Sequence, residues 1–121
     1  MGYSNPENKP WAQQKIIELS PKTVLDVGAG QGTYLNLIRE GLGAGVLVSA
    51  VEVWQPYIDQ FDLLNRYDKL FAIDVREMTN FKYDLVILGD ILEHMSEYDA
   101  VALWENISKQ AKCAMISIPI I

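Results

Sequence analysis

Cysteine and histidine are scarce in this 121-residue chain, and each scarcity excludes a kind of chemistry. The single cysteine, Cys113, excludes an internal disulfide and predicts a reducing, cytoplasmic compartment. With a single histidine, His94, and no H-E-x-x-H or C-x-x-C spacing, metal catalysis has little support. The chain has no G-x-S-x-G elbow, and Cys113 begins an apolar run in which an inert, buried thiol is expected.

Positive charge and long apolar runs are scarce as well. Lys and Arg number 10 and Asp and Glu number 16, so the net charge is −6. Because nucleic-acid affinity rests mostly on cations, this balance disfavours DNA or RNA as a partner. No run is apolar for long enough to span a bilayer, and the N-terminus lacks the apolar core of a signal peptide. The composition predicts one soluble domain over residues 1–121, with no nucleic-acid or membrane partner.

Five apolar runs, rich in β-branched residues, are expected to form strands. They cover residues 23–27, 46–53, 69–73, 83–88 and 113–118. Segments of helical spacing separate most of them, and the strands are apolar throughout rather than alternating. Both features favour an α/β fold, a doubly wound and mostly parallel sheet with helices on both faces.

The expected helices begin and end at recognisable residues. One begins at Pro10 and ends before Ser20, and a second runs from the glycines after residue 27 to about Arg39. A third begins at Pro56, and its expected buried face consists of Tyr57, Phe61 and Leu64. A fourth begins at Ser96, which forms a capping box with Asp99, and its expected buried stripe consists of Ala100, Leu103, Trp104 and Ile107.

The run from Val24 to Leu35 is the most informative part of the chain. A strand containing Asp26 ends in alternating glycines at Gly28, Gly30 and Gly32, a pattern built for close approach of backbone to a ligand. A dinucleotide fingerprint, G-x-G-x-x-G, would need its third glycine at position 33, where this chain has threonine. A nicotinamide cofactor is therefore disfavoured.

This D-x-G-x-G-x-G pattern resembles the first motif of the class I S-adenosylmethionine-dependent methyltransferases. The resemblance covers residues 23–118 and implies a Rossmann-like sheet of order 3-2-1-4-5, with S-adenosylmethionine as cofactor and S-adenosylhomocysteine as product. Family members carry two further strands, numbers six and seven, beyond the last strand expected here. We therefore expect a chain truncated at its C-terminus. Such a chain is expected to retain binding of the methyl donor more readily than catalytic turnover.

Acidic residues follow three of the expected strands, at the sheet edge where parallel α/β folds bind ligands. Glu52 is expected at the sheet rim, where it accepts hydrogen bonds from both ribose hydroxyls of the donor, the alternative being a solvated acid at a strand end. The next two residues, Val53 and Trp54, could sandwich the adenine ring, although Trp54 could equally belong to the core.

Asp74 resembles the family's third motif. The resemblance implies that its side chain accepts from the exocyclic amine of adenine and that the N–H of Val75 meets a ring nitrogen. The alternative is an Asp that caps the local turn. For Asp26 the choice lies between the ammonium of the ligand and a brace for the glycine turn.

The segment 83–95 resembles the fourth motif, in which the main chain of Gly89 and Asp90 faces the methionine part of the ligand and the substrate. His94 could act as a general base, but a local hydrogen bond is the favoured interpretation. No catalytic residue is assigned. The expected cofactor-binding residues are Asp26, Gly28, Ala29, Gly30, Glu52, Val53, Trp54, Asp74, Val75, Gly89 and Asp90.

These residues predict methyl transfer to a small or medium-sized acceptor molecule. The alternative is a non-catalytic module that binds S-adenosylmethionine or a partner. The last strand, 113–118, has no charge and no proline, so its open edge lacks the usual protections against pairing. We expect a homodimer through this edge unless the N-terminal arm covers it.

Overall fold

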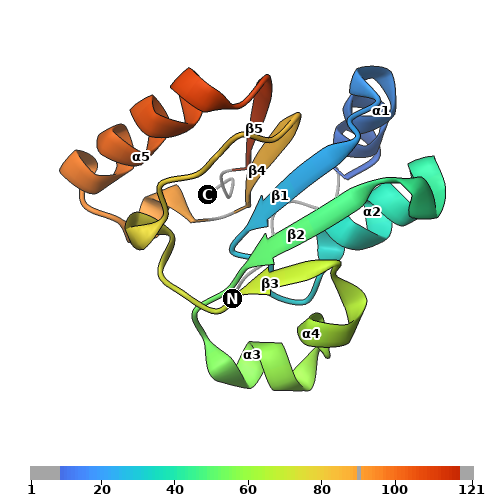
Figure 1. The fold of residues 1–121 in the computed structure, drawn as a ribbon, viewed down its shortest axis with the longest axis horizontal. Helices are drawn as coiled ribbons and strands as arrows, with labels where there is room; N and C mark the ends of the chain where they lie inside the picture. The colour runs from blue at the N-terminus through green and yellow to red at the C-terminus, as the bar shows by residue number, and fades with distance from the viewer. Residues whose placement is uncertain (1–8, 90, 118–121) are drawn as a thin grey trace.

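The computed structural model describes residues 9–89 and 91–117, which form one parallel sheet covered by helices (Figure 1). The strands are β1 (Thr23–Val27), β2 (Leu47–Val51), β3 (Lys69–Phe71), β4 (Leu85–Gly89) and β5 (Cys113–Ser117). Their order is β3-β2-β1-β4-β5, and every neighbouring pair is parallel. This confirms the expected fold class and strand order.

Helices cover both faces of the sheet. They are α1 (Lys9–Leu19), α2 (Thr33–Leu42), α3 (Gln55–Gln60), α4 (Leu63–Arg66) and α5 (Glu97–Gln110). One core cluster contains buried side chains of α1, α2, α3 and α4, and the other contains those of α5. Figure 1 shows α5 on the opposite side of the sheet from α1 and α2.

The central strand β1 divides its side chains between these two cores. Val24 packs in the cluster with α1 and α2, and its neighbour Leu25 packs in the cluster with α5. Because successive side chains of a strand point to opposite faces, Asp26 lies on the same side as Val24. All three are at most 1% exposed. The acid of the glycine motif is therefore a core residue.

The helix expected from Pro56 is broken in two, and one predicted core position is wrong. Asp62 adopts a left-handed conformation with φ of 52°, which ends α3 and lets α4 begin in a new direction. Helical spacing does not continue across such a residue. Leu63 is consequently buried, whereas Leu64, the expected core residue, is 69% exposed. Tyr57 and Phe61 do lie together, with ring centroids 5.5 Å apart.

The connection after the third strand is shorter in regular structure than the other connections. Strand β3 ends at Phe71, and the connection to β4 contains a 3-10 turn (Val75–Glu77) where the described residues form no α-helix. Three buried side chains, Val75, Met78 and Phe81, cover the sheet there.

In α5 the N-cap is confirmed because Ser96 Oγ accepts from Asp99 N at 3.1 Å. Its buried residues are Leu103 and Ile107, with Trp104 38% exposed at the edge of the stripe.

Candidate functional site

The glycine turn after β1 has a conformation that only glycine adopts readily. Gly28, Gly30 and Gly32 have φ angles of 71°, 55° and 83°, all in the left-handed region. Backbone bonds hold the turn against the end of β2, with Gly28 N donating to Val51 O at 2.8 Å. Ala29 donates to the same carbonyl at 3.3 Å and is buried. These hydrogen bonds attach the turn to the carboxyl edge of the sheet.

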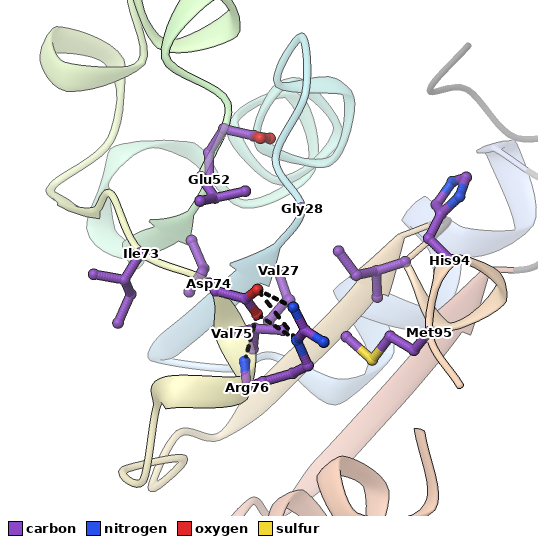
Figure 2. Close-up of a pocket in the computed structure, with 12 residues that line it drawn as sticks. Val27, Gly28, Glu52, Ile73, Asp74, Val75, Arg76, His94 and Met95 are labelled. Carbon is purple, nitrogen blue, oxygen red and sulfur yellow. Dashed lines mark hydrogen bonds and ion pairs between the residues drawn. The ribbon is translucent and has the colours of Figure 1, made fainter. Parts of the chain in front are cut away.

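A cavity of about 180 Å³ opens beside this turn, at the carboxyl ends of β1 and β2 (Figure 2). Five of the expected cofactor-binding residues line it: Gly28, Glu52, Val53, Asp74 and Val75. The other lining residues are Val27, Val51, Ile73, Arg76, Ile91, His94 and Met95. The topology therefore brings together residues that are far apart in the sequence.

Glu52 is buried at the end of β2, with 8% of its surface exposed, so it is neither a solvated acid nor a rim residue. Its Oε1 accepts from Gly30 N at 2.9 Å, and its Oε2 accepts from Trp54 N at 3.1 Å. A carboxylate has about four acceptor sites, so each oxygen retains capacity for a ligand donor. Glu52 fixes the glycine turn and the loop after β2, which was not expected from the sequence.

Asp74 follows β3 and already has a partner. Its two oxygens accept from the guanidinium of Arg76, with the shortest separation 2.6 Å from Nη2 to Oδ2, and Oδ1 also accepts from Arg76 N at 2.9 Å (Figure 2). These hydrogen bonds from Arg76 hold the pKa of Asp74 below its usual range. The alternative interpretation, an Asp that caps the local turn, is therefore present. A ligand amine would have to share this carboxylate with Arg76.

Sequence reasoning missed Arg76. Its Nη1 also contacts Asp99 Oδ2 at 3.2 Å, so one guanidinium links the loop after β3 to the first turn of α5. Asp74 lines the cavity and Asp99 does not, and the two carboxylates together neutralise the guanidinium. The only signal in the sequence was a cation two residues after Asp74.

Asp26 does not line the cavity; it is bonded within the core. The hydroxyl of Tyr67, which is 41 residues away in the chain, donates to Asp26 Oδ2 at 2.6 Å. Burial, and then the charge of Asp26, raises the pKa of Tyr67 well above its usual value, so the hydroxyl stays protonated. Asp26 thus ties the end of β1 to the chain just before β3. Tyr67 was also missed.

The remaining expected residues are placed as follows. Trp54 is 57% exposed, which excludes the core interpretation, and it is not among the residues lining the cavity. Gly89 ends β4, where a Cβ would come within 2.9 Å of the Tyr34 ring. Asp90 lies outside the described residues. His94 is 73% exposed in its side chain, and its Nε2 lies 3.5 Å from Glu93 Oε1, which makes an ion pair only when the imidazole is protonated.

Among residues 9–89 and 91–117, no three His, Cys, Asp or Glu side chains gather closely enough to hold a metal ion. Within that same part of the chain, no helix has the length and apolarity needed to cross a membrane.

No family model and no curated protein matches the chain, but solved structures resemble it. A protein from Nostoc punctiforme PCC 73102, provisionally named an O-methyltransferase, has a TM-score of 0.70 over 87% of this chain, at 20% identity. An S-adenosylmethionine-dependent methyltransferase from Clostridium acetobutylicum ATCC 824 has a TM-score of 0.68 over 86%, at 18% identity. The plantazolicin methyltransferase BpumL, solved with S-adenosylhomocysteine, has a TM-score of 0.62 over 87%, at 18% identity.

The chain spans 33%, 45% and 45% of the lengths of these three proteins. At such identities the likeness concerns the fold. The chain has the five-stranded, Rossmann-like core found in class I S-adenosylmethionine-dependent methyltransferases.

Proposed function

We propose that this chain binds S-adenosylmethionine and takes part in methyl transfer to a small or medium-sized acceptor, with S-adenosylhomocysteine as the product. The observation that carries the proposal is the cavity at the carboxyl edge of the sheet. It lies beside three left-handed glycines and contains two carboxylates, Glu52 and Asp74, while its one cation is neutralised by acids. This lining suits a ligand rich in donors and without phosphates.

Different residues around the cavity would bind different parts of the ligand. The Glu52 carboxylate would accept from ribose hydroxyls, and the Asp74 carboxylate together with the Val75 amide would take the adenine edge. At about 180 Å³ the cavity is smaller than the roughly 300–1,000 Å³ usual for ligand pockets, so it would enclose the nucleoside part. The remainder would lie over the glycine turn, toward Gly89 at the end of β4.

Little acid–base chemistry is required of this chain. The donor supplies an already activated methyl group, so the protein contributes mainly alignment of the acceptor. A base is needed only if the acceptor must lose a proton. His94 lines the cavity beside Glu93 and is the one imidazole available for that purpose.

Two further proposals concern partners and compartment. We propose that the protein works in the cytoplasm on a small molecule, without nucleic acid. A second copy would pair with β5, which lies at the end of the strand order and has one neighbour, β4, in the described sheet. Ile116 on this strand is 43% exposed.

Isothermal titration tests the proposed function. S-adenosylhomocysteine should bind to the chain at one site, and NADH should not compete with it. Tight NADH binding with no response to S-adenosylhomocysteine would contradict the proposal. A methyl-transfer assay with labelled donor and a metabolite extract then separates a transferase from a non-catalytic binding module.

A further inference from the structure

Arg66, the last residue of α4, joins three segments through one guanidinium. Its Nη1 donates to Gln31 O and to Phe61 O, each at 3.0 Å. Its Nη2 donates to Asn36 Oδ1 at 3.1 Å. The planar, five-donor guanidinium can hold such partners at the same time, which a lysine ammonium does less well. Arg66 therefore links the glycine turn and the start of α2 to the α3–α4 junction.

The third glycine of the motif makes room for this arginine. A Cβ on Gly32 would lie 2.5 Å from Arg66 Nη2 and 2.8 Å from Arg66 Cζ. Gly32 also has a φ of 83° and stands at the N-cap of α2. The missing side chain at this position thus accommodates a group of the protein itself.

Glu52 and Arg66 each form a hydrogen bond with the backbone of the glycine turn. Gly30 N donates to Glu52 Oε1 at 2.9 Å, and the carbonyl of the next residue, Gln31, accepts from Arg66. Glu52 and Arg66 are the first and last residues of one segment, residues 52–66, which contains α3 and α4. Together they set the orientation of the peptide groups at the centre of the turn.

We propose that Arg66 is a positioning residue for ligand binding, acting through the glycine turn. The inference rests on the proposed function and assigns a role to a residue that does not line the cavity. Without Arg66 the turn keeps its bonds to β2 but loses the hydrogen bond that Gln31 O accepts from Arg66 Nη1. If the binding geometry is then populated about a tenth of the time, apparent affinity falls about tenfold.

Arg66→Gln is the test variant, and Arg39→Gln is its matched control. Arg39 also donates to two backbone carbonyls, Gly43 O at 3.2 Å and Val46 O at 2.7 Å, and to one side chain, Asp68. It lies on α2 and is not part of the cavity wall. Both variants should lower the free energy of unfolding, and only Arg66→Gln should weaken S-adenosylhomocysteine binding. Arg66→Lys should restore part of the lost affinity.

Amide hydrogen exchange supplies a readout that needs no ligand. The Gly30 and Gly32 amides should exchange faster in Arg66→Gln than in Arg39→Gln. Equal affinity and equal exchange in the two variants would overturn the inference. If the wild-type chain binds no S-adenosylhomocysteine, the proposed function fails, and the exchange rates alone then decide whether Arg66 fixes the turn.

Discussion

Glu52 and Asp74, the carboxylates nearest the cavity, both accept hydrogen bonds from the chain itself, but from donors of different kinds. Glu52 accepts from the backbone of Gly30 and Trp54, which are held by the fold. Asp74 accepts mostly from the side chain of Arg76, which is 54% exposed. A ligand donor would therefore share Asp74 with an exposed side chain, whereas it would share Glu52 with backbone amides.

Glu52→Ala should weaken S-adenosylhomocysteine binding more than any other single change in the cavity wall. Each hydrogen bond to a charged group contributes about 1.5–3 kcal/mol, and the variant also releases the Gly30 amide. We expect affinity to fall by at least about tenfold, since 1.4 kcal/mol corresponds to a factor of ten. Because Glu52 is buried, the free energy of unfolding should fall too.

Glu77→Ala is the control for this prediction, since it removes an exposed acid from the 3-10 turn after β3. Calorimetric titration measures the ligand affinity, and urea denaturation measures stability. Unchanged affinity in the Glu52 variant would exclude its assigned role.

At the scale of elements, the amino ends of the central strands are tied together by side chains. The N–H of Asp84, just before β4, donates to Thr23 Oγ1 at 3.0 Å, and Lys22 N donates back to Asp84 Oδ2 at 2.9 Å. Lys112 Nζ lies 3.3 Å from Asp84 Oδ1, just before β5. One acid thus holds the starts of β1, β4 and β5, at the edge opposite to the cavity.

Asp84→Asn should flatten the acid dependence of stability. The Lys22 N–H, assisted by Lys112, holds the pKa of Asp84 below its ordinary value despite the opposing effect of burial. A lowered native pKa stabilises the fold above about pH 4, the value for an unfolded Asp, and this contribution is lost as the pH falls further. The variant should be less stable at pH 7 and should lose less stability on acidification.

Urea denaturation at a series of pH values from neutral into the acid range measures this difference. Identical acid slopes in wild type and Asp84→Asn would contradict the assignment.

At the scale of the molecule, the cavity and the open strand lie in different parts of the sheet. The cavity lies at the carboxyl ends of β1 and β2, whereas β5 ends the strand order on the far side of β4. The segment that holds the glycine turn, residues 52–66, lies toward the β3 edge (Figure 1). Association through β5 would therefore take place on the side of β4 that faces away from β1 and β2.

Light scattering should detect a dimer of this chain that dissociates on dilution. Ile116→Lys should shift the equilibrium toward monomer, because a lysine on an edge strand opposes pairing with another strand. Val101→Lys, on the exposed side of α5, adds the same charge at a site 49% exposed and should leave association unchanged. A monodisperse monomer at high protein concentration would contradict the proposed pairing.

Local patterns were sufficient to predict the strands and the edge of the sheet that holds the cavity. Apolar runs identified all five strands to within about two residues, because strands buried on both faces contain few polar side chains. The glycines at 28, 30 and 32 predicted a turn suited to close backbone approach, and all three adopt the left-handed conformation that other residues rarely adopt. Acids at strand ends predicted which edge holds the cavity, because parallel strands end together.

Partners of these residues were decided only by the tertiary structure. The bonds from Tyr67 to Asp26 and from Arg66 to Gln31 join residues 41 and 35 positions apart, and no local spacing encodes such pairs. The break at Asp62 was missed for a related reason: its left-handed conformation depends on packing that buries the next residue, Leu63. The sequence thus determined which residues reach the carboxyl edge, and packing determined what each of them contacts there.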